Sequence, residues 1–135
     1  MQDGILLFDA DGSIRACNAS AEQMFGLTAN QIVGRSARDP RWRTIHEDGA
    51  PFPAEEYPVT VTLRTGTPCV NIIMGVHKPD DTVTWIAINS QPLFRANEVV
   101  PYAVVTNCTD ITQRKQLEEE LSRATTELAE INQRL

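Results

Sequence analysis

The chain has 135 residues, enough for one domain with a single core and an appendage. Its net charge of −6 would repel phosphate backbones, so we expect no nucleic-acid partner. The longest apolar runs are only as long as a strand, which argues against direct membrane insertion. Cys17, Cys69 and Cys108 occur singly with no secretory signal. This pattern predicts reduced thiols and a cytoplasmic location, alone or within a larger membrane-associated sensor.

Five segments are predicted to be strands. Residues 4–9 and 13–17 flank an Asp-Gly turn, and residues 70–77, 83–93 and 99–109 are separated by short polar turns. Short turns between strands require antiparallel neighbours. The first strand runs directly from the chain start, which indicates a fragment of a longer protein. We expect an α+β fold, with a five-stranded antiparallel sheet and helices on one face.

The segment between the two groups of strands is predicted to be helical in part. Ser20 and Gln23 are spaced as a capping box and predict a helix that Gly26 ends. A second helix is expected over residues 54–65, with Pro58 in its first turns. The rest of the segment, with its prolines, is expected to be loop with short helical turns.

The C-terminal segment, residues 113–135, contains neither Gly nor Pro and predicts one long helix. Its apolar residues are spaced 4, 3, 4, 3, 4, as in the a/d seam of a coiled coil. These residues are Leu117, Leu121, Ala124, Leu128, Ile131 and Leu135. The 3.5-residue period favours pairing with the same helix of a second copy. The alternative is a helix packed back on its own sheet.

Several sequence motifs together resemble the PAS family of sensory domains. They are GILLFDADGSIRACNASAEQMFG, the glycine of QIVGRS, HEDGAPFPAEEYPVTVTLRTG, NIIMGVHKPDDTVTWIAINSQPLF and CTDITQRKQLEEEL. The resemblance covers the whole chain. It implies a PAS fold enclosing a small cavity in a sensory domain over residues 1–112. It also implies a coiled-coil signalling helix over residues 113–135. That helix would lead to an effector in the full-length bacterial protein, such as a histidine kinase or a cyclic-dinucleotide enzyme.

The junction between the last strand and the helix is Asp110-Ile111-Thr112. Thr112 is expected to cap the helix, and Asp110 can meet both the helix N-terminus and a nearby cation. A change in the last strand could therefore tilt or rotate the helix. The resemblance implies that this junction is the coupling point.

Strand alternation predicts which side chains face the cavity. The candidate pocket residues are Ile72, Met74, Val76, Ile86, Ile88, Ser90, Val104, Thr106 and Cys108 from strands, with Met24, Phe25, Val59 and Leu63 from helices. They describe a site for a small, largely apolar or amphipathic ligand. A filled core that holds nothing is the alternative. The thiol of Cys108 could react or bind, although buried cysteines are usually inert.

The identity of a cofactor remains unknown from the sequence. Flavin photoreceptors of this family carry an Asn-Cys-Arg-Phe-Leu-Gln run that is missing here, which disfavours covalent flavin. Haem-binding members use a histidine on the long helix, and residues 54–65 have none, which disfavours haem. Non-covalent flavin or another small ligand is compatible with the sequence. His46-Glu47-Asp48 favours a turn closed by Gly49 over a metal site.

Two functions fit these patterns. One is a ligand-responsive sensor whose two states differ in ligand affinity. The other is a ligand-free dimerisation and relay module. A small-molecule enzyme is disfavoured, because no nucleophile–base or metal-ligand spacing occurs. If the long helix does not make the dimer, we expect the contact on the outer sheet face, around Ile73, Trp85, Ala87 and Val105.

Overall fold

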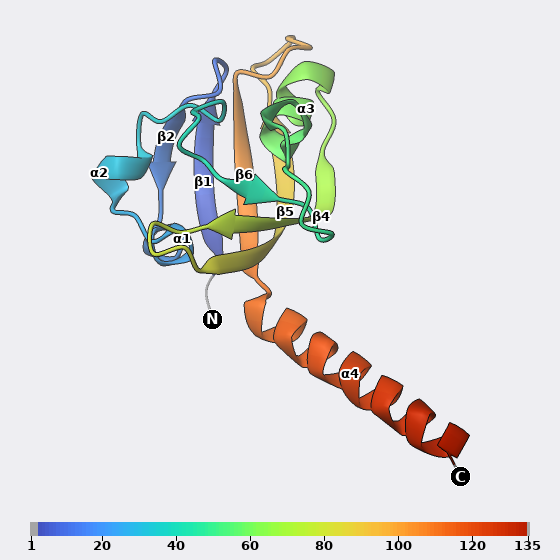
Figure 1. Ribbon diagram of the computed structural model, residues 1–135. Helices are drawn as coiled ribbons and strands as arrows, with labels where there is room; N and C mark the ends of the chain where they lie inside the picture. Colours follow the sequence, from blue (N-terminus) through green and yellow to red (C-terminus); the bar gives the residue numbers. More distant parts are fainter. Residues whose placement is uncertain (1–2, 135) are drawn as a thin grey trace.

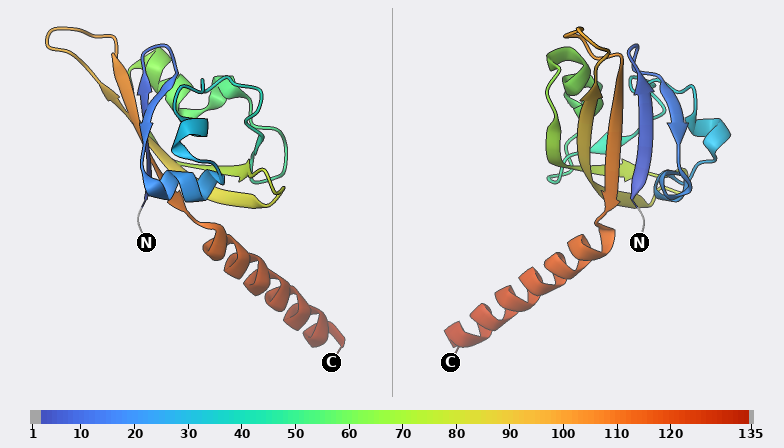
Figure 2. Two further views of the ribbon diagram at one scale, coloured as in Figure 1. Left: turned by 90° about the vertical axis from the view of Figure 1, so that its left-hand side faces the viewer. Right: turned by 180° about the vertical axis from the view of Figure 1, so that it is seen from behind.

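The computed structural model describes residues 3–134 of an α+β fold. One antiparallel sheet has the order β2-β1-β6-β5-β4-β3. The elements are β1 (Gly4–Asp9), β2 (Ile14–Cys17), α1 (Ala19–Phe25), α2 (Ala29–Ile32), β3 (Thr44–Ile45), η1 (Ala54–Glu56), α3 (Pro58–Thr65), β4 (Cys69–His77), β5 (Val83–Leu93), β6 (Ala103–Asp110) and α4 (Thr112–Arg134). The sheet is curled, and α1, α2 and α3 lie on its concave side (Figures 1 and 2). The predicted fold class is confirmed.

The sheet has six strands, so the prediction of five was one too few. The additional strand, β3, pairs with the edge of β4 through Thr44 opposite Val76 and Ile45 opposite Gly75. It lies in the segment that we expected to be loop. A strand of two residues is too short to show the alternation by which strands are predicted.

Helix α1 begins two residues earlier than the sequence pattern suggested. Asn18, not Ser20, is the N-cap, and its Oδ1 accepts the backbone N–H of Ala21 at 3.0 Å. The same oxygen accepts the N–H of Ile5 at 2.9 Å. Asn18 therefore caps the helix and fastens it to β1. At the other end Gly26, with φ +66°, supplies the left-handed conformation that ends α1.

The helix expected over residues 54–65 is interrupted at Tyr57. Proline disfavours the helical conformation in the residue before it, and Tyr57 is accordingly extended, with ψ 141°. Pro58 then occupies the first position of α3, where its missing N–H costs nothing. The result is a short 3-10 turn, η1, followed by α3, with the Tyr57 side chain at the corner.

The hydrophobic core lies between the concave side of the sheet and the helices. Its least exposed large side chains include Ile14, Ile32, Ile86 and Val104, each at most 2% exposed. The irregular segment between α2 and η1 contributes Ala37 and Phe52 to the same core. This segment, which is irregular apart from β3, therefore covers the concave side of the sheet.

Helix α4 leaves the body from the end of β6 and extends away from it (Figures 1 and 2). Among residues 113–134, every side chain except Lys115 is exposed. The alternative in which this helix packs back on its own sheet is therefore wrong. No helix within residues 3–134 has the length and apolarity needed to cross a bilayer.

Candidate ligand cavity and helix junction

A cavity of about 70 Å³ lies between the sheet and the segment that covers it. Its walls come from every layer of the domain. They are formed by Leu6, Phe8, Ile14, Phe25, Ala37, Trp42, Thr44, Tyr57, Pro58, Val59, Met74, Val76, Ile86, Ile88, Thr106 and Cys108. The lining is almost entirely apolar, so the cavity offers dispersion contacts and few hydrogen bonds.

Eight of the predicted pocket residues line this cavity, and five lie elsewhere. Phe25, Val59, Met74, Val76, Ile86, Ile88, Thr106 and Cys108 are in the lining. Met24 and Val104 are buried in the core outside the lining, and Leu63 and Ile72 are half-buried and pack against that core. Ser90, the fifth, is also outside the lining, where its hydroxyl binds other parts of the protein.

Ser90 is buried in a hydrogen-bond network that joins α3 to the sheet. Its Oγ donates to the carbonyl of Pro58 at 3.3 Å, and that carbonyl can only accept. The hydroxyls of Ser90 and Thr62 share a bond of 2.6 Å, in which either can be the donor. The backbone N–H of Cys69 also donates to Ser90 Oγ, at 3.3 Å. With these partners Ser90 has no proton left for a ligand and acts as a clamp.

A short chain of hydrogen bonds supplies the polar part of the cavity wall. The Thr44 hydroxyl donates to the carbonyl of Phe52 at 3.1 Å. Since Thr44 has one proton, the bond of 2.8 Å between Thr44 and Tyr57 is donated by the Tyr57 hydroxyl. The lone pairs of Tyr57 are then available to accept a bond from a ligand. Burial raises the pKa of Tyr57, which keeps the phenol protonated at neutral pH.

Cys108 lines the cavity from β6 and is 2% exposed. Burial raises the pKa of its thiol to about 12. Because the thiolate is the nucleophile, a thiol with so high a pKa is poorly suited to covalent chemistry. Thr106, its neighbour on the same strand face, donates to the carbonyl of Leu6 at 3.5 Å.

Sequence reasoning missed the part of the wall that comes from irregular segments. Trp42 is held by three contacts: its Nε1–H donates to the carbonyl of Ser36 at 3.0 Å, Phe25 lies 5.5 Å away between ring centroids, and the Arg35 guanidinium lies 4.5 Å above the ring. No periodic pattern marks such a residue. Leu6 and Phe8 were also missed, although alternation along β1 would have indicated them.

The junction residues grip the backbone of β5 at Trp85. The N–H of Ile111 donates to the carbonyl of Trp85 at 2.8 Å, and the N–H of Trp85 donates to Thr112 Oγ1 at 2.9 Å. Thr112 therefore anchors the helix to β5. The prediction that Thr112 caps the helix is wrong. Asp110 does meet the helix N-terminus, because its Oδ1 accepts the N–H of Thr112 at 2.9 Å. Ile111 is buried and accepts the first helical bond, from Lys115.

The side chains of His46, Glu47 and Asp48 point to three different partners. The ring of His46 stacks on Phe52 at 4.1 Å between centroids. The carboxylate of Glu47 lies 3.0 Å from the ammonium of Lys115, and Asp48 accepts the N–H of Ala50. Gly49 has φ +88°, the left-handed conformation of a tight turn. The three residues thus form a turn.

Comparison with known proteins matches this architecture to one family. A family model described as PAS domain matches residues 2–113. No curated protein matches the chain. Among solved structures, the PAS domain of a Colwellia psychrerythraea protein has 19% identity and a TM-score of 0.61, covering 82% of this chain and 87% of that one.

Two further solved structures come from histidine kinases. A sensory box histidine kinase/response regulator from Burkholderia thailandensis has 18% identity and a TM-score of 0.64, covering 95% of this chain and 91% of that one. The LOV domain of a blue-light activated histidine kinase from Erythrobacter litoralis has 17% identity and a TM-score of 0.61, covering 82% and 97%. At these identities the structural likeness concerns the fold.

Proposed function

The chain belongs to the PAS domain family, and we propose that it senses a small apolar ligand and passes the signal through a dimeric C-terminal helix. One observation carries this proposal. Strand β6 lines the cavity with Thr106 and Cys108, and within four residues it continues into α4. A change in the cavity wall therefore has a short covalent path to the helix.

We divide the chain into a sensory domain, residues 1–112, and a signalling helix, residues 113–135. The effector would follow in the full-length protein. Two of the structural relatives are named as histidine kinases, and this supports an effector of that kind. A cyclic-dinucleotide enzyme is the alternative effector. The chain itself would then carry no catalytic activity. A cytoplasmic location, alone or within a membrane-associated sensor, stays a prediction.

The size of the cavity limits the ligand. Sites that bury drug-sized molecules measure roughly 300–1,000 Å³, several times the 70 Å³ seen here. A molecule of a few heavy atoms fits, whereas non-covalent flavin would require the covering segment to move outward. Haem has no histidine ligand available in the wall, because neither His46 nor His77 is among the lining residues. The Tyr57 hydroxyl would accept one hydrogen bond from the ligand.

The apolar stripe of α4 supports a dimer with a second copy. Leu117, Leu121, Leu128 and Ile131 are each between 52% and 69% exposed, although they are large and apolar. Pairing along the a/d seam would bury all four. Leu135, the last seam residue, lies outside the described residues.

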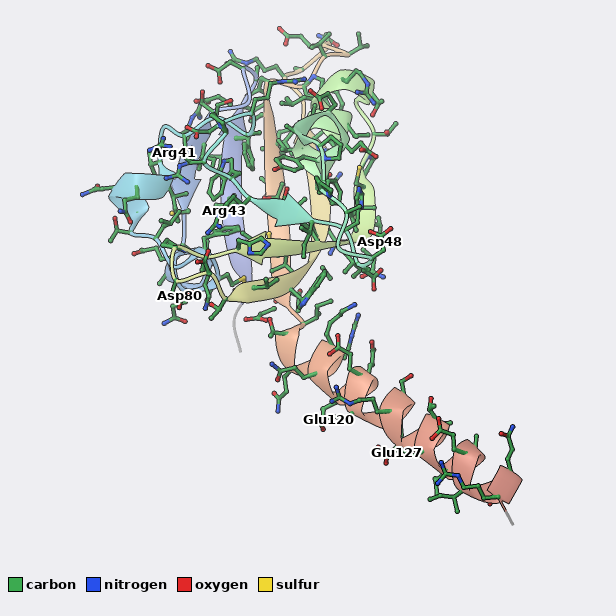
Figure 3. The ribbon with its side chains drawn as sticks, viewed as in Figure 1. Arg41, Arg43, Asp48, Asp80, Glu120 and Glu127 are labelled. Carbon is green, nitrogen blue, oxygen red and sulfur yellow. The ribbon has the colours of Figure 1, made fainter. Side chains whose placement is uncertain are left out.

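The charges beside the stripe make different contacts in parallel and antiparallel pairs. With the seam as assigned, Glu120 and Glu127 occupy g positions and lie on the same side of α4 (Figure 3). In an antiparallel pair that buries the whole seam, Leu121 faces Ile131 and g faces g, so Glu120 would oppose Arg134 and Glu127 would oppose Glu127 of the second copy. In a parallel pair, g faces e, and the two glutamates oppose Thr125 and Asn132 instead. The parallel arrangement avoids the contact between two Glu127 side chains, whereas the antiparallel arrangement combines that contact with two Glu120–Arg134 pairs.

A ligand-free relay module is the second candidate, and the small cavity volume favours it. Here α4 would transmit strain from a neighbouring domain through the same junction. The outer sheet face could supply an additional dimer contact, since Ile73, Trp85 and Val105 are half-buried there and Ala87 is 8% exposed.

Native mass spectrometry and an absorption spectrum of the purified full chain separate the two candidates. A small bound mass, or a band above about 300 nm from a chromophore, supports the sensor. If the mass is that of the protein alone, xenon is the next probe, because it binds apolar cavities without hydrogen bonds. Methyl resonances of Ile86 and Ile88 that do not respond to xenon pressure would favour the relay.

A further inference from the structure

Lys115 is the one side chain of residues 113–134 that is not exposed, and two contacts hold it. Its ammonium lies 3.0 Å from Glu47 Oε2 and 4.6 Å from the centre of the Trp85 ring. The Lys115 side chain is 14% exposed and that of Glu47 is 59% exposed. A cation over an indole that also pairs with a carboxylate is held by two attractions.

The indole itself is positioned by the absence of a side chain at Gly75. A Cβ at Gly75 would lie 3.0 Å from the Trp85 ring and 2.8 Å from Ile45 Cγ1. Glycine at this position therefore gives the ring room against β4. Ile45 belongs to β3, so β3 and the Trp85 ring pack together, and Lys115 lies over that ring. The turn that follows β3, residues 46–49, is called the β3 turn.

Helix α4 is attached to the body at two points, and two points fix its direction where one would leave it free to swing. Ile111 and Thr112 bind the Trp85 backbone and fix the point at which α4 starts. Lys115 lies one turn further along and binds a different element, the turn after β3. Together, the two attachments determine the angle at which α4 leaves the sheet.

β3, the β3 turn and the bridge between Ile45 and Pro51 form a hairpin, residues 44–51, that also contributes to the cavity wall. Thr44, in β3, lines the cavity and bonds to Tyr57, whereas Glu47 follows three residues later in the turn. Figure 3 shows the labelled neighbour Asp48 beside the lower end of the sheet, on the side from which α4 departs. The hairpin thus touches the cavity with one residue and the helix with another.

We propose that Lys115 is a positioning residue for α4, and that the β3 turn transmits movement of the cavity wall to it through Glu47. The first part stands on the contacts alone, and the second rests on the proposed sensory function. The route runs from Tyr57 through Thr44 and Glu47 to Lys115. It is separate from the covalent path along β6.

The positioning role is tested by NMR on the full chain. Protons on the Lys115 ε-carbon, held over the Trp85 ring, resonate upfield, and residual dipolar couplings report the direction of α4. We expect Glu47→Gln to remove at least half of the upfield shift and to broaden the orientation of α4. Glu118→Gln is the matched control, because it breaks an exposed pair with Arg114 in the same helix. The role is overturned if Glu47→Gln leaves both readouts unchanged.

The transmission route is tested by adding xenon under pressure. We expect xenon to shift the Ile86 and Ile88 methyl resonances and to change the Lys115 signal. In Glu47→Gln the methyl response should persist while the Lys115 response is lost. Methyl shifts without any Lys115 change in the wild type refute the route but leave the proposed cavity intact.

If xenon does not enter, the proposed ligand cavity is wrong. A second variant then still tests the route. Thr44→Val removes the bond to Tyr57 without needing a ligand. The route predicts that this variant shifts the Lys115 signal, and an unchanged signal refutes the route independently of any ligand.

Discussion

Ser90→Ala is expected to destabilise the domain by loosening α3 from the sheet. The substitution removes one buried oxygen that is bound to Thr62, Cys69 and Pro58. It leaves almost no space unfilled, since only the hydroxyl is lost. The effect therefore reports the hydrogen bonds rather than a cavity.

The expected magnitude follows from those three bonds. Each buried hydrogen bond contributes about 1 kcal/mol net, and an unpaired buried N–H costs about 1–3 kcal/mol. Some of this loss is recovered, because the Thr62 hydroxyl can turn toward Cys69 Sγ, 3.6 Å away. We expect a loss of about 2–3 kcal/mol, a large share of the roughly 5–15 kcal/mol typical of a domain.

Urea unfolding followed by circular dichroism measures this loss. The matched control is Ser122→Ala on the exposed surface of α4, for which we expect a change within about 0.5 kcal/mol. Thr62→Val combined with Ser90→Ala should cost less than the sum of the single changes, because the two hydroxyls share one bond. A Ser90→Ala variant within about 0.5 kcal/mol of wild type would refute the clamp.

Three further predictions concern single side chains. Because burial raises the folded pKa of Cys108 from the usual 9.0 to about 12, stability should fall as pH rises above 9, by at most about 1.4 kcal/mol per pH unit for this group; pH-dependent unfolding of Cys108→Ala should show a shallower fall, and equal slopes contradict this. Gly75→Ala should cost about 1–3 kcal/mol in thermal unfolding, because its Cβ would meet Ile45 and Trp85, and unchanged stability would contradict that packing. Thr112→Val should cost about 1–3 kcal/mol by leaving the Trp85 N–H unpaired, while Thr112→Ser keeps the hydroxyl and should cost less; equal losses in denaturant unfolding would show that the bond is unimportant.

The elements with clear periodicity could be predicted from the sequence. The long strands β4 and β5 and the heptad helix α4 lie within one residue of their predicted bounds, since many residues contribute to each pattern. Alternation also assigned Met74, Ile86 and Cys108 to the inner face of the sheet, and all three line the cavity. The strand β3 has only two residues and gave no such signal.

The cavity wall was harder to predict, because part of it depends on contacts between distant segments. Trp42 reaches the cavity from a loop and Thr44 from the two-residue strand β3 that follows, and tertiary packing sets the path of both. Ser90 has the correct strand face, yet its hydroxyl is used by Thr62 and Pro58, and a strand pattern cannot reveal hydrogen-bond partners. The partner of Lys115 lies 68 residues away in the chain, beyond any local pattern.

Light scattering tests the central claim that the stripe on α4 joins two copies. Leu121→Lys with Leu128→Lys places two charges on the seam, whereas Ser122→Lys with Thr126→Lys places the same charges at b and f positions, away from it. We predict a molar mass of twice 15.0 kDa for wild type and for the control, and of 15.0 kDa for the seam variant. Circular dichroism should show that the sheet of the seam variant is intact. A folded seam variant that remains a dimer would contradict the account and place the contact elsewhere, on the outer sheet face.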